Sequence, residues 1–174
     1  MEWWQILLYV LCILTLIYLL GFFYALESII TFRGKIKKRT IAISLLLSEK
    51  KDVLLSMYSL IENANLLKDE ATRDITTQVR WLQTANLKTN EIENTIATLS
   101  SLQKRLFLFS SEKELQNNED FLAYMDMAKD LDANYRKSAA IFNSDLLGYE
   151  YWRKTPLFRF WFFVFGFKKM KRLP

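Results

Sequence analysis

Residues 116–155 read QNNEDFLAYMDMAKDLDANYRKSAAIFNSDLLGYEYWRKT and contain the clearest repeat in the chain. Two series recur every seven positions, offset by four: Phe121, Ala128, Tyr135, Phe142 and Tyr149, and Met125, Asp132, Ala139 and Leu146. This spacing places both series on one face of a long helix. Asp132 is the only charge in this stripe. Because aspartate is rarely buried without a partner, it lies either at the edge of the stripe in water or inside it with a partner.

Two more helices are expected before this segment. The first carries a stripe of Ile36, Ile43, Leu47, Leu54, Met57, Ile61 and Ala64, into which Lys50 falls. The second covers about 69–109, with apolar positions at Ile75, Val79, Leu82, Ile92, Ile96, Leu99, Leu102 and Leu106. Its middle, TANLKTNE (84–91), is poor in apolar residues and strong helix formers, so we consider a break or hinge there. Residues 110–118 are expected to form a polar connection.

Amphipathic helices hide their apolar faces by packing together, so the sequence predicts an all-α antiparallel bundle.

A different pattern begins the chain. Residues 6–26, ILLYVLCILTLIYLLGFFYAL, hold no charge, and their length matches the ~20 residues that cross a bilayer. A cleaved signal peptide would have a basic start, a shorter apolar core and small residues at the cleavage site, and none of these is present. We therefore predict a retained, single-pass transmembrane helix as an anchor (1–32), followed by a helical domain (33–155) and a tail (156–174). No breaker except Gly34 separates the span from the next helix.

Charge is sorted along the chain. Residues 33–39 (RGKIKKR) carry five basic residues and 153–172 carry seven, whereas 40–152 has a net charge of −5. Since basic residues accumulate on the cytoplasmic flank of a span, the N-terminus is expected outside the cell membrane and the helical domain in the cytoplasm. The acidic middle argues against nucleic acid as a partner.

The tail combines rings and charge. Seven of the residues in 157–167 are aromatic. The segment is too short to span a bilayer. Three placements of this segment are open: flat on the membrane surface, folded into the core of the bundle, or packed against a partner. We favour the membrane surface, where the basic residues would bind anionic headgroups. The predicted membrane-interface residues are Phe158, Phe160, Trp161, Phe162, Phe163, Phe165, Phe167, Lys168, Lys169, Lys171 and Arg172, with Arg33, Lys35, Lys37, Lys38 and Arg39 after the span.

Several of these positions resemble the LemA family, bacterial membrane-anchored helical proteins. The family motif is matched by Leu115 and Phe121, Asp132, Phe142-Asn143, Tyr149-Glu150, Pro156 and Phe165-Gly166-Phe167, with weaker matches at Lys50, Asp52 and Arg80. The chain departs from it where Phe142 replaces Tyr, Glu150 replaces Asn, Ala139-Ala140 replaces an Arg-rich position, and Tyr-Pro is missing before Leu115. The resemblance covers about 27–169 and implies an anchored helical bundle facing the cytoplasm, without supplying an enzyme activity.

The resemblance also draws attention to one pair. Lys50 and Asp132 occupy two charged positions of the family, and each interrupts an apolar stripe. We hypothesise that they meet across the bundle and fix the register of two helices.

No reaction is indicated by the residue types. The chain has no histidine and one cysteine, and it lacks a Gly-rich phosphate loop or a metal-ligand spacing, so we expect no enzyme, cofactor or metal. The expected function is an interaction or scaffold protein at the cytoplasmic membrane surface, which binds a membrane protein or copies of itself, with Trp81, Tyr151 and Trp152 as candidate contacts. The alternatives are membrane remodelling by self-assembly and tail insertion, and an enzyme that uses carboxylates.

Overall fold

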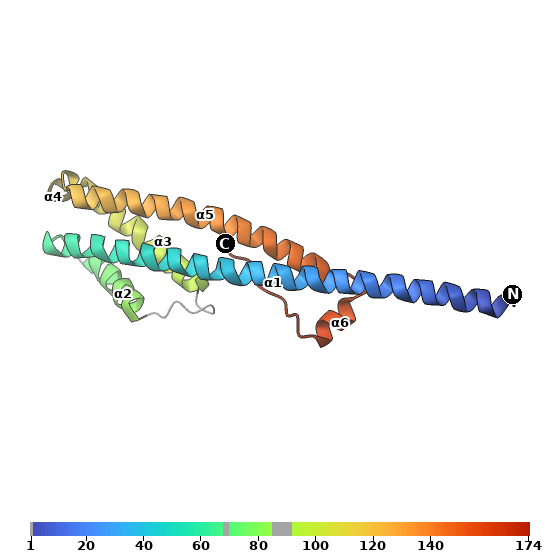
Figure 1. The fold of residues 1–174 in the computed structure, drawn as a ribbon. Coiled ribbons are helices and arrows are strands. Elements are labelled where there is room, and N and C mark those ends of the chain that lie inside the picture. The colour runs from blue at the N-terminus through green and yellow to red at the C-terminus, as the bar shows by residue number, and fades with distance from the viewer. Residues whose placement is uncertain (1, 68–69, 85–91) are drawn as a thin grey trace. The chain divides into compact units, whose positions relative to one another are not determined.

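The computed structural model describes residues 2–67, 70–84 and 92–174, and every regular element within these ranges is a helix (Figure 1). The elements are α1 (Trp3–Asn63), α2 (Glu70–Thr84), α3 (Ile92–Leu108), the short 3-10 helix η1 (Phe109–Ser111), α4 (Lys113–Gln116), α5 (Glu119–Lys154) and α6 (Arg159–Val164). The predicted all-α class is confirmed for these ranges. Residues 110–118, expected to be a polar connection, contain most of η1 and all of α4.

The chain divides into two compact units. Unit 1 comprises residues 1–38 and 142–172, and unit 2 comprises residues 39–141 and 173–174. Unit 1 therefore brings together residues that the sequence analysis assigns to three segments, namely the anchor, the C-terminal part of the helical domain and the tail.

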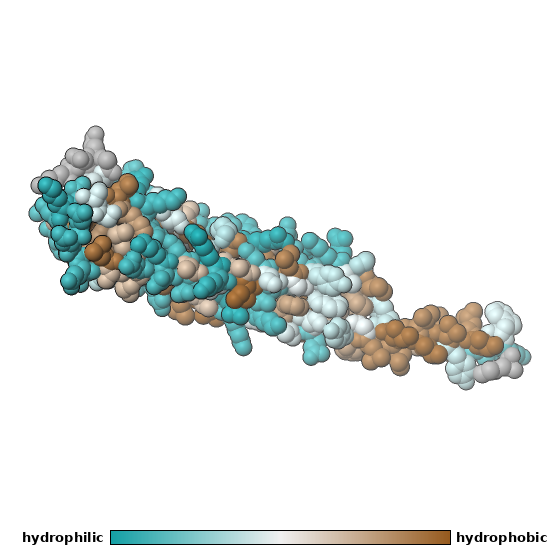
Figure 2. All heavy atoms as spheres, turned by 90° about the horizontal axis from the view of Figure 1, so that it is seen from above, coloured by the Kyte–Doolittle hydropathy of each residue, from teal (hydrophilic) through white to brown (hydrophobic). Residues whose placement is uncertain are grey.

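The first helix, α1, continues without interruption from the apolar run through the basic segment and into the stripe that follows. Gly34 is tolerated in its interior at a cost of about 1 kcal/mol. Within the described ranges, α1 is the one helix long and apolar enough to cross a membrane. Nearly all side chains from Ile6 to Leu20 are exposed, and Figure 2 shows the apolar surface that they form at the N-terminal end of the helix.

The predicted stripes form the core of unit 2. In α1 the buried side chains include Ile43, Leu47, Leu54, Met57 and Ile61, and in α5 they include Phe121, Ala128 and Ala139. α2 contributes Ile75, Val79 and Leu82, and α3 contributes Leu99, Leu102 and Leu106. Heptad spacing thus identifies most of this core, because each helix turns one face toward its neighbours.

The helix expected over 69–109 is not continuous: it is divided into α2 and α3, on either side of the segment where a break was considered. Arg105 pairs with Asp74 at 3.2 Å, and Gln78 donates to Ser101 at 3.3 Å, so α2 and α3 run antiparallel and face each other. A continuous helix would hold these pairs far apart along its axis. The hinge considered for 84–91 falls mostly on residues 85–91, which lie outside the described residues.

Two helix ends in unit 2 carry recognisable caps. The side chain of Asn118 accepts a hydrogen bond from the Phe121 amide at 3.0 Å, which caps the N-terminus of α5. Asn65, at φ 55°, ends α1 in a left-handed turn, and the Leu66 amide donates back to the Ile61 carbonyl at 3.3 Å. Asparagine tolerates this conformation better than most residues do.

Candidate membrane-interface site

The tail of the chain packs against the first third of α1 within unit 1. The ring of Phe22 lies 5.8–6.4 Å, centroid to centroid, from the rings of Phe158, Trp161, Phe162 and Phe165. We call these five residues the aromatic cluster. Phe162 is fully buried and also contacts Phe158 and Phe167, so it is the central ring of this packing.

Two hydrogen bonds join the tail to one level of α1. The Trp161 indole donates to the Tyr18 hydroxyl at 3.1 Å, and the Tyr18 hydroxyl donates to the Leu157 carbonyl at 3.3 Å. Aromatic side chains with a polar atom suit the boundary between an apolar and a wet layer. The tail therefore contacts α1 from Tyr18 onward, inside the run 6–26 that is predicted to lie in the membrane.

A tight turn ends α6 and reverses the chain. Gly166 has φ +73°, its amide donates to the Phe163 carbonyl, and the Phe167 amide donates to the Phe162 carbonyl, both at 3.0 Å. This is the glycine-terminated cap that satisfies the last carbonyls of a helix. It turns the Phe167 ring back to bury it against unit 1.

The predicted interface aromatics separate into two groups. Phe158, Phe162 and Phe167 are buried in unit 1. This burial is what the alternative that the tail folds into the protein core predicts for these three rings. Phe160, Trp161, Phe163 and Phe165 remain exposed, Phe163 by 81% of its surface. Their contact with lipid stays a prediction.

The basic segment after the span meets the basic end of the tail. The Arg33 guanidinium lies 5.7 Å from the centroid of the Phe167 ring, and the Tyr149 hydroxyl donates to the Lys168 carbonyl at 2.9 Å. Lys35 stacks over the Phe32 ring at 5.2 Å. The other predicted basic residues are exposed: Lys37, Lys38, Lys169, Lys171 and Arg172 in unit 1, and Arg39 in unit 2.

A buried carboxylate lies among these charges. A hydrogen bond from Lys154, at 3.2 Å, lowers the pKa of Glu150, and the charges of Lys154, Arg172 and Arg153 lower it further, while burial opposes them. Burial raises the pKa of the neighbouring Tyr149, against the charges of Arg33 and Arg153. Basic groups from α1, α5 and the tail thus surround Tyr149 and Glu150. We define the cationic surface as Arg33, Lys35, Lys37, Arg153, Lys168 and Arg172.

A second polar cluster lies in unit 2. Lys50 Nζ contacts Asp132 Oδ1 at 2.5 Å, so the structure brings together the two charges that interrupt the stripes. The Lys50 side chain is 5% exposed and that of Asp132 is 30% exposed. Gln103, from α3, donates to Asp132 Oδ2 at 2.8 Å. One carboxylate therefore connects α1, α3 and α5.

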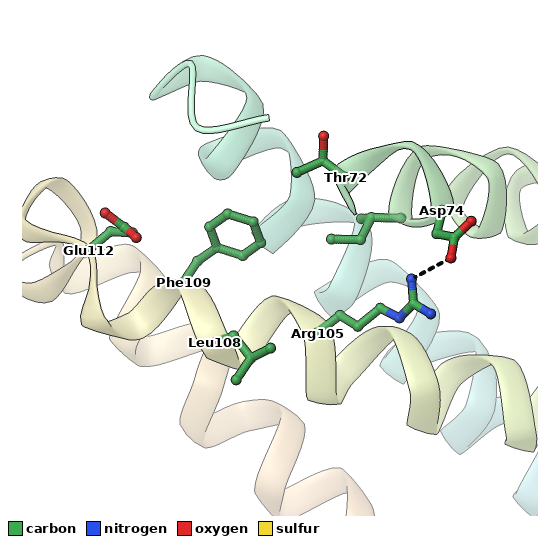
Figure 3. A pocket seen from close by; sticks show the side chains of 7 residues that line it. Thr72, Asp74, Arg105, Leu108, Phe109 and Glu112 are labelled. Atoms are coloured by element: carbon green, nitrogen blue, oxygen red, sulfur yellow. Dashed lines mark hydrogen bonds and ion pairs between the residues drawn. The ribbon is translucent and has the colours of Figure 1, made fainter. Parts of the chain in front are cut away.

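An open hollow of about 480 Å³ lies beside η1 in unit 2 (Figure 3). Thr72, Ile75, Leu108, Phe109 and Glu112 line it, together with the exposed ion pair between Arg105 and Asp74. The lining offers no arrangement of a nucleophile and a base. Among the described residues, no group of three or more histidine, cysteine or carboxylate side chains is placed to hold a metal ion.

The candidate contact residues differ in exposure. Tyr151 is the most exposed, and its ring packs edge-on against Trp152, which also contacts Tyr24. Trp81, on α2, is partly exposed.

The sequence did not point to four contributors to these sites. Gln103 resembles any polar residue at the edge of a stripe, and Tyr18 and Phe22 are hidden in an apolar run. Gly148 is the fourth: a Cβ there would lie 2.5 Å from the Phe32 ring, so the ring packs directly on the backbone. A glycine inside a strongly periodic helix was an available signal for such a close approach.

No protein-family model, curated protein or solved structure matches the chain.

Proposed function

We propose that this chain is a membrane-anchored helical interaction protein of the kind that the LemA resemblance implies. α1 crosses the cell membrane once, and the remaining helices dock at its cytoplasmic surface and hold a partner there. The protein acts by binding rather than by catalysis.

One observation carries this proposal. Every side chain of α1 from Ile6 to Ile17 is exposed, and Figure 2 shows the apolar surface that this part of the helix presents on one face. Soluble monomers rarely expose contiguous apolar patches larger than a few hundred Å². A bilayer covers this helix completely, and the backbone groups are already satisfied within it.

The inner boundary of the span follows from the tail. Because tail residues contact α1 at Tyr18 and Phe22, lipid surrounds the helix on all sides only before this level. From Trp3 to Phe22, where the tail packs on α1, the helix extends about 30 Å at 1.5 Å per residue, close to the hydrocarbon thickness. The basic segment 33–38 then follows in the cytoplasm, as the positive-inside rule requires.

Topology is tested first, on the full-length chain with Cys12→Ala. A cysteine introduced as Glu2→Cys should react with a membrane-impermeant maleimide in intact cells, and one introduced as Lys113→Cys should react only after lysis. The chain should also remain in the membrane pellet at alkaline pH. Release from the pellet, or the reverse labelling, would contradict the proposed anchor or its orientation.

Partner binding is tested by crosslinking in native membranes, purification in mild detergent and mass spectrometry. A membrane protein recovered in stoichiometric amount supports an adaptor, and crosslinks between copies alone support a self-assembling scaffold. A chain recovered as an uncrosslinked monomer would contradict the interaction role.

A further inference from the structure

We propose that the cationic surface and the exposed rings of α6 form a single site for the headgroups of anionic phospholipids. The inference rests on the proposed membrane anchor and adds the ligand and the residues that bind it. Its new element is that the fold joins two basic segments, distant in sequence, into one site.

Charge is concentrated in the unit that carries the anchor. Unit 1 contains eleven basic and four acidic residues, a net charge of +7, whereas unit 2 has a net charge of −2. One of the four acids, Glu2, precedes the span. Another, Glu150, is buried and hydrogen-bonded to Lys154. The excess positive charge of unit 1 therefore attracts anions to its surface.

Two contacts hold the basic segments together. The Phe167 ring lies under the Arg33 guanidinium, and the Lys168 carbonyl accepts the hydrogen bond of Tyr149. Lys37 lies one helical turn after Arg33, on the same side of α1. A phosphate near Phe167 is therefore within reach of cations from both segments.

Arg153, on α5, adds a guanidinium close to Tyr149 and Glu150. Its Nε is buried and has no hydrogen-bond partner among the described residues. A buried donor without a partner is costly, and guanidinium groups bind phosphate oxygens through paired N–H groups. A headgroup phosphate is expected to accept hydrogen bonds from the terminal Nη groups of this partly exposed side chain rather than from Nε.

The exposed rings favour a bilayer over a soluble polyanion. Phe160 and Phe163 are exposed on a tail that packs against α1 beside the apolar surface of the span. Rings at this level lie at the boundary between acyl chains and headgroups, with the cations next to them. A soluble anion would gain nothing from these rings.

The test measures which lipids the full-length chain retains. The chain is reconstituted in vesicles of equal phosphatidylglycerol and phosphatidylcholine, extracted in mild detergent and analysed for co-purified phospholipid. We expect the ratio of retained phosphatidylglycerol to retained phosphatidylcholine to be at least about 5:1, against 1:1 in the vesicle, which is about the effect of one cation near a membrane surface.

Two fourfold variants each remove one basic segment: R33Q/K35Q/K37Q/K38Q and K168Q/K169Q/K171Q/R172Q. Either should bring the retained lipid close to the vesicle composition. The matched control K104Q/K113Q/R136Q/K137Q removes four exposed charges from unit 2 and should leave the enrichment unchanged.

Two variants keep every charge and loosen the junction. Phe167→Leu removes the ring under Arg33, and Tyr149→Phe removes the hydrogen bond to Lys168 at nearly constant volume. Both should lower the enrichment, Phe167→Leu by severalfold, while circular dichroism shows unchanged helix content. If both leave it unchanged, the two segments act separately and the single site is wrong.

The remaining outcomes are also decisive. A chain that stays in the membrane pellet but retains both lipids equally overturns the lipid site and leaves the anchor intact. A chain released from the pellet overturns the proposed function itself. If soluble glycerol phosphate displaces the retained lipid, the site is a general anion site and the assignment to a bilayer fails.

Discussion

Units 1 and 2 both contain parts of α1 and α5, yet different side chains hold each unit together. Unit 1 contains nineteen of the 26 aromatic residues, and its close contacts are ring on ring, ring on glycine and guanidinium on ring. Unit 2 has a largely aliphatic core at heptad spacing and one ion pair inside it. We therefore expect single ring substitutions to account for a large part of the free energy of unfolding of unit 1. In unit 2 this free energy is expected to be distributed over many smaller aliphatic contacts.

The largest effect should come from the central ring of unit 1. Phe162→Ala removes a fully buried side chain that contacts three other rings. We expect a loss of about 4 kcal/mol in the stability of unit 1. Hydrogen exchange of the full-length chain in detergent should show faster exchange in 142–154 and unchanged exchange in α3.

Phe163→Ala is the matched control, because the neighbouring ring is almost fully exposed. It should leave exchange in both units unchanged. Equal effects of the two substitutions would mean that the tail does not pack through Phe162.

The next effect concerns the ion pair of unit 2. Asp132→Ala leaves the buried Lys50 ammonium without its carboxylate and Gln103 without its acceptor. Removing one member of a buried pair costs about 3 kcal/mol. Urea unfolding followed by exchange in α3 should show this loss in unit 2, with unit 1 little affected.

The double variant Lys50→Met with Asp132→Leu separates stability from register. A well-packed apolar replacement of a buried pair is often close to neutral in free energy, so the protein should fold. If the pair fixes the register, crosslinks between cysteines placed on α1 and α5 should change their preferred partners. An unchanged pattern of crosslinks would contradict the register role.

This contrast also separates what the sequence could predict from what it could not. The heptad series beginning at Phe121 predicts the core of unit 2, because side-chain direction in a helix follows directly from spacing. The antiparallel pairing of α2 with α3 was missed, because helical period alone does not reveal where a chain reverses. For the candidate site, the sequence predicted which residue types take part but not which of them are buried. Because most positions in 157–167 are aromatic, spacing does not distinguish the buried Phe162 from the exposed Phe163.

A smaller effect is expected where a ring packs on backbone. Gly148→Ala places a methyl group within 2.5 Å of the Phe32 ring, which must move. Overpacking of this kind costs about 2 kcal/mol. The loss should appear in the thermal unfolding of the full-length chain and in exchange near residue 148.

Gly34→Ala is the opposite case in the same unit. Nothing lies within 4 Å of the added Cβ, and alanine is the better helix former, so we expect a gain of about 1 kcal/mol. If both substitutions stabilise the protein, the close approach of Phe32 to Gly148 is wrong.

The smallest effect is a pH dependence confined to unit 1. The pKa of Glu150 is lower in the folded protein than the ordinary 4.5, chiefly because Lys154 donates a hydrogen bond to the carboxylate. A lowered pKa contributes stability that is present above the ordinary value and is lost as the pH falls through the folded value. Acidification below about pH 4.5 should therefore lower the protection of amides around residue 150, measured against their intrinsic exchange rates, more in the parent chain than in Glu150→Gln, which has no carboxyl group to titrate. An identical acid response in the two proteins would show that Glu150 is not the counter-ion of this site, and that the excess positive charge of unit 1 is balanced elsewhere.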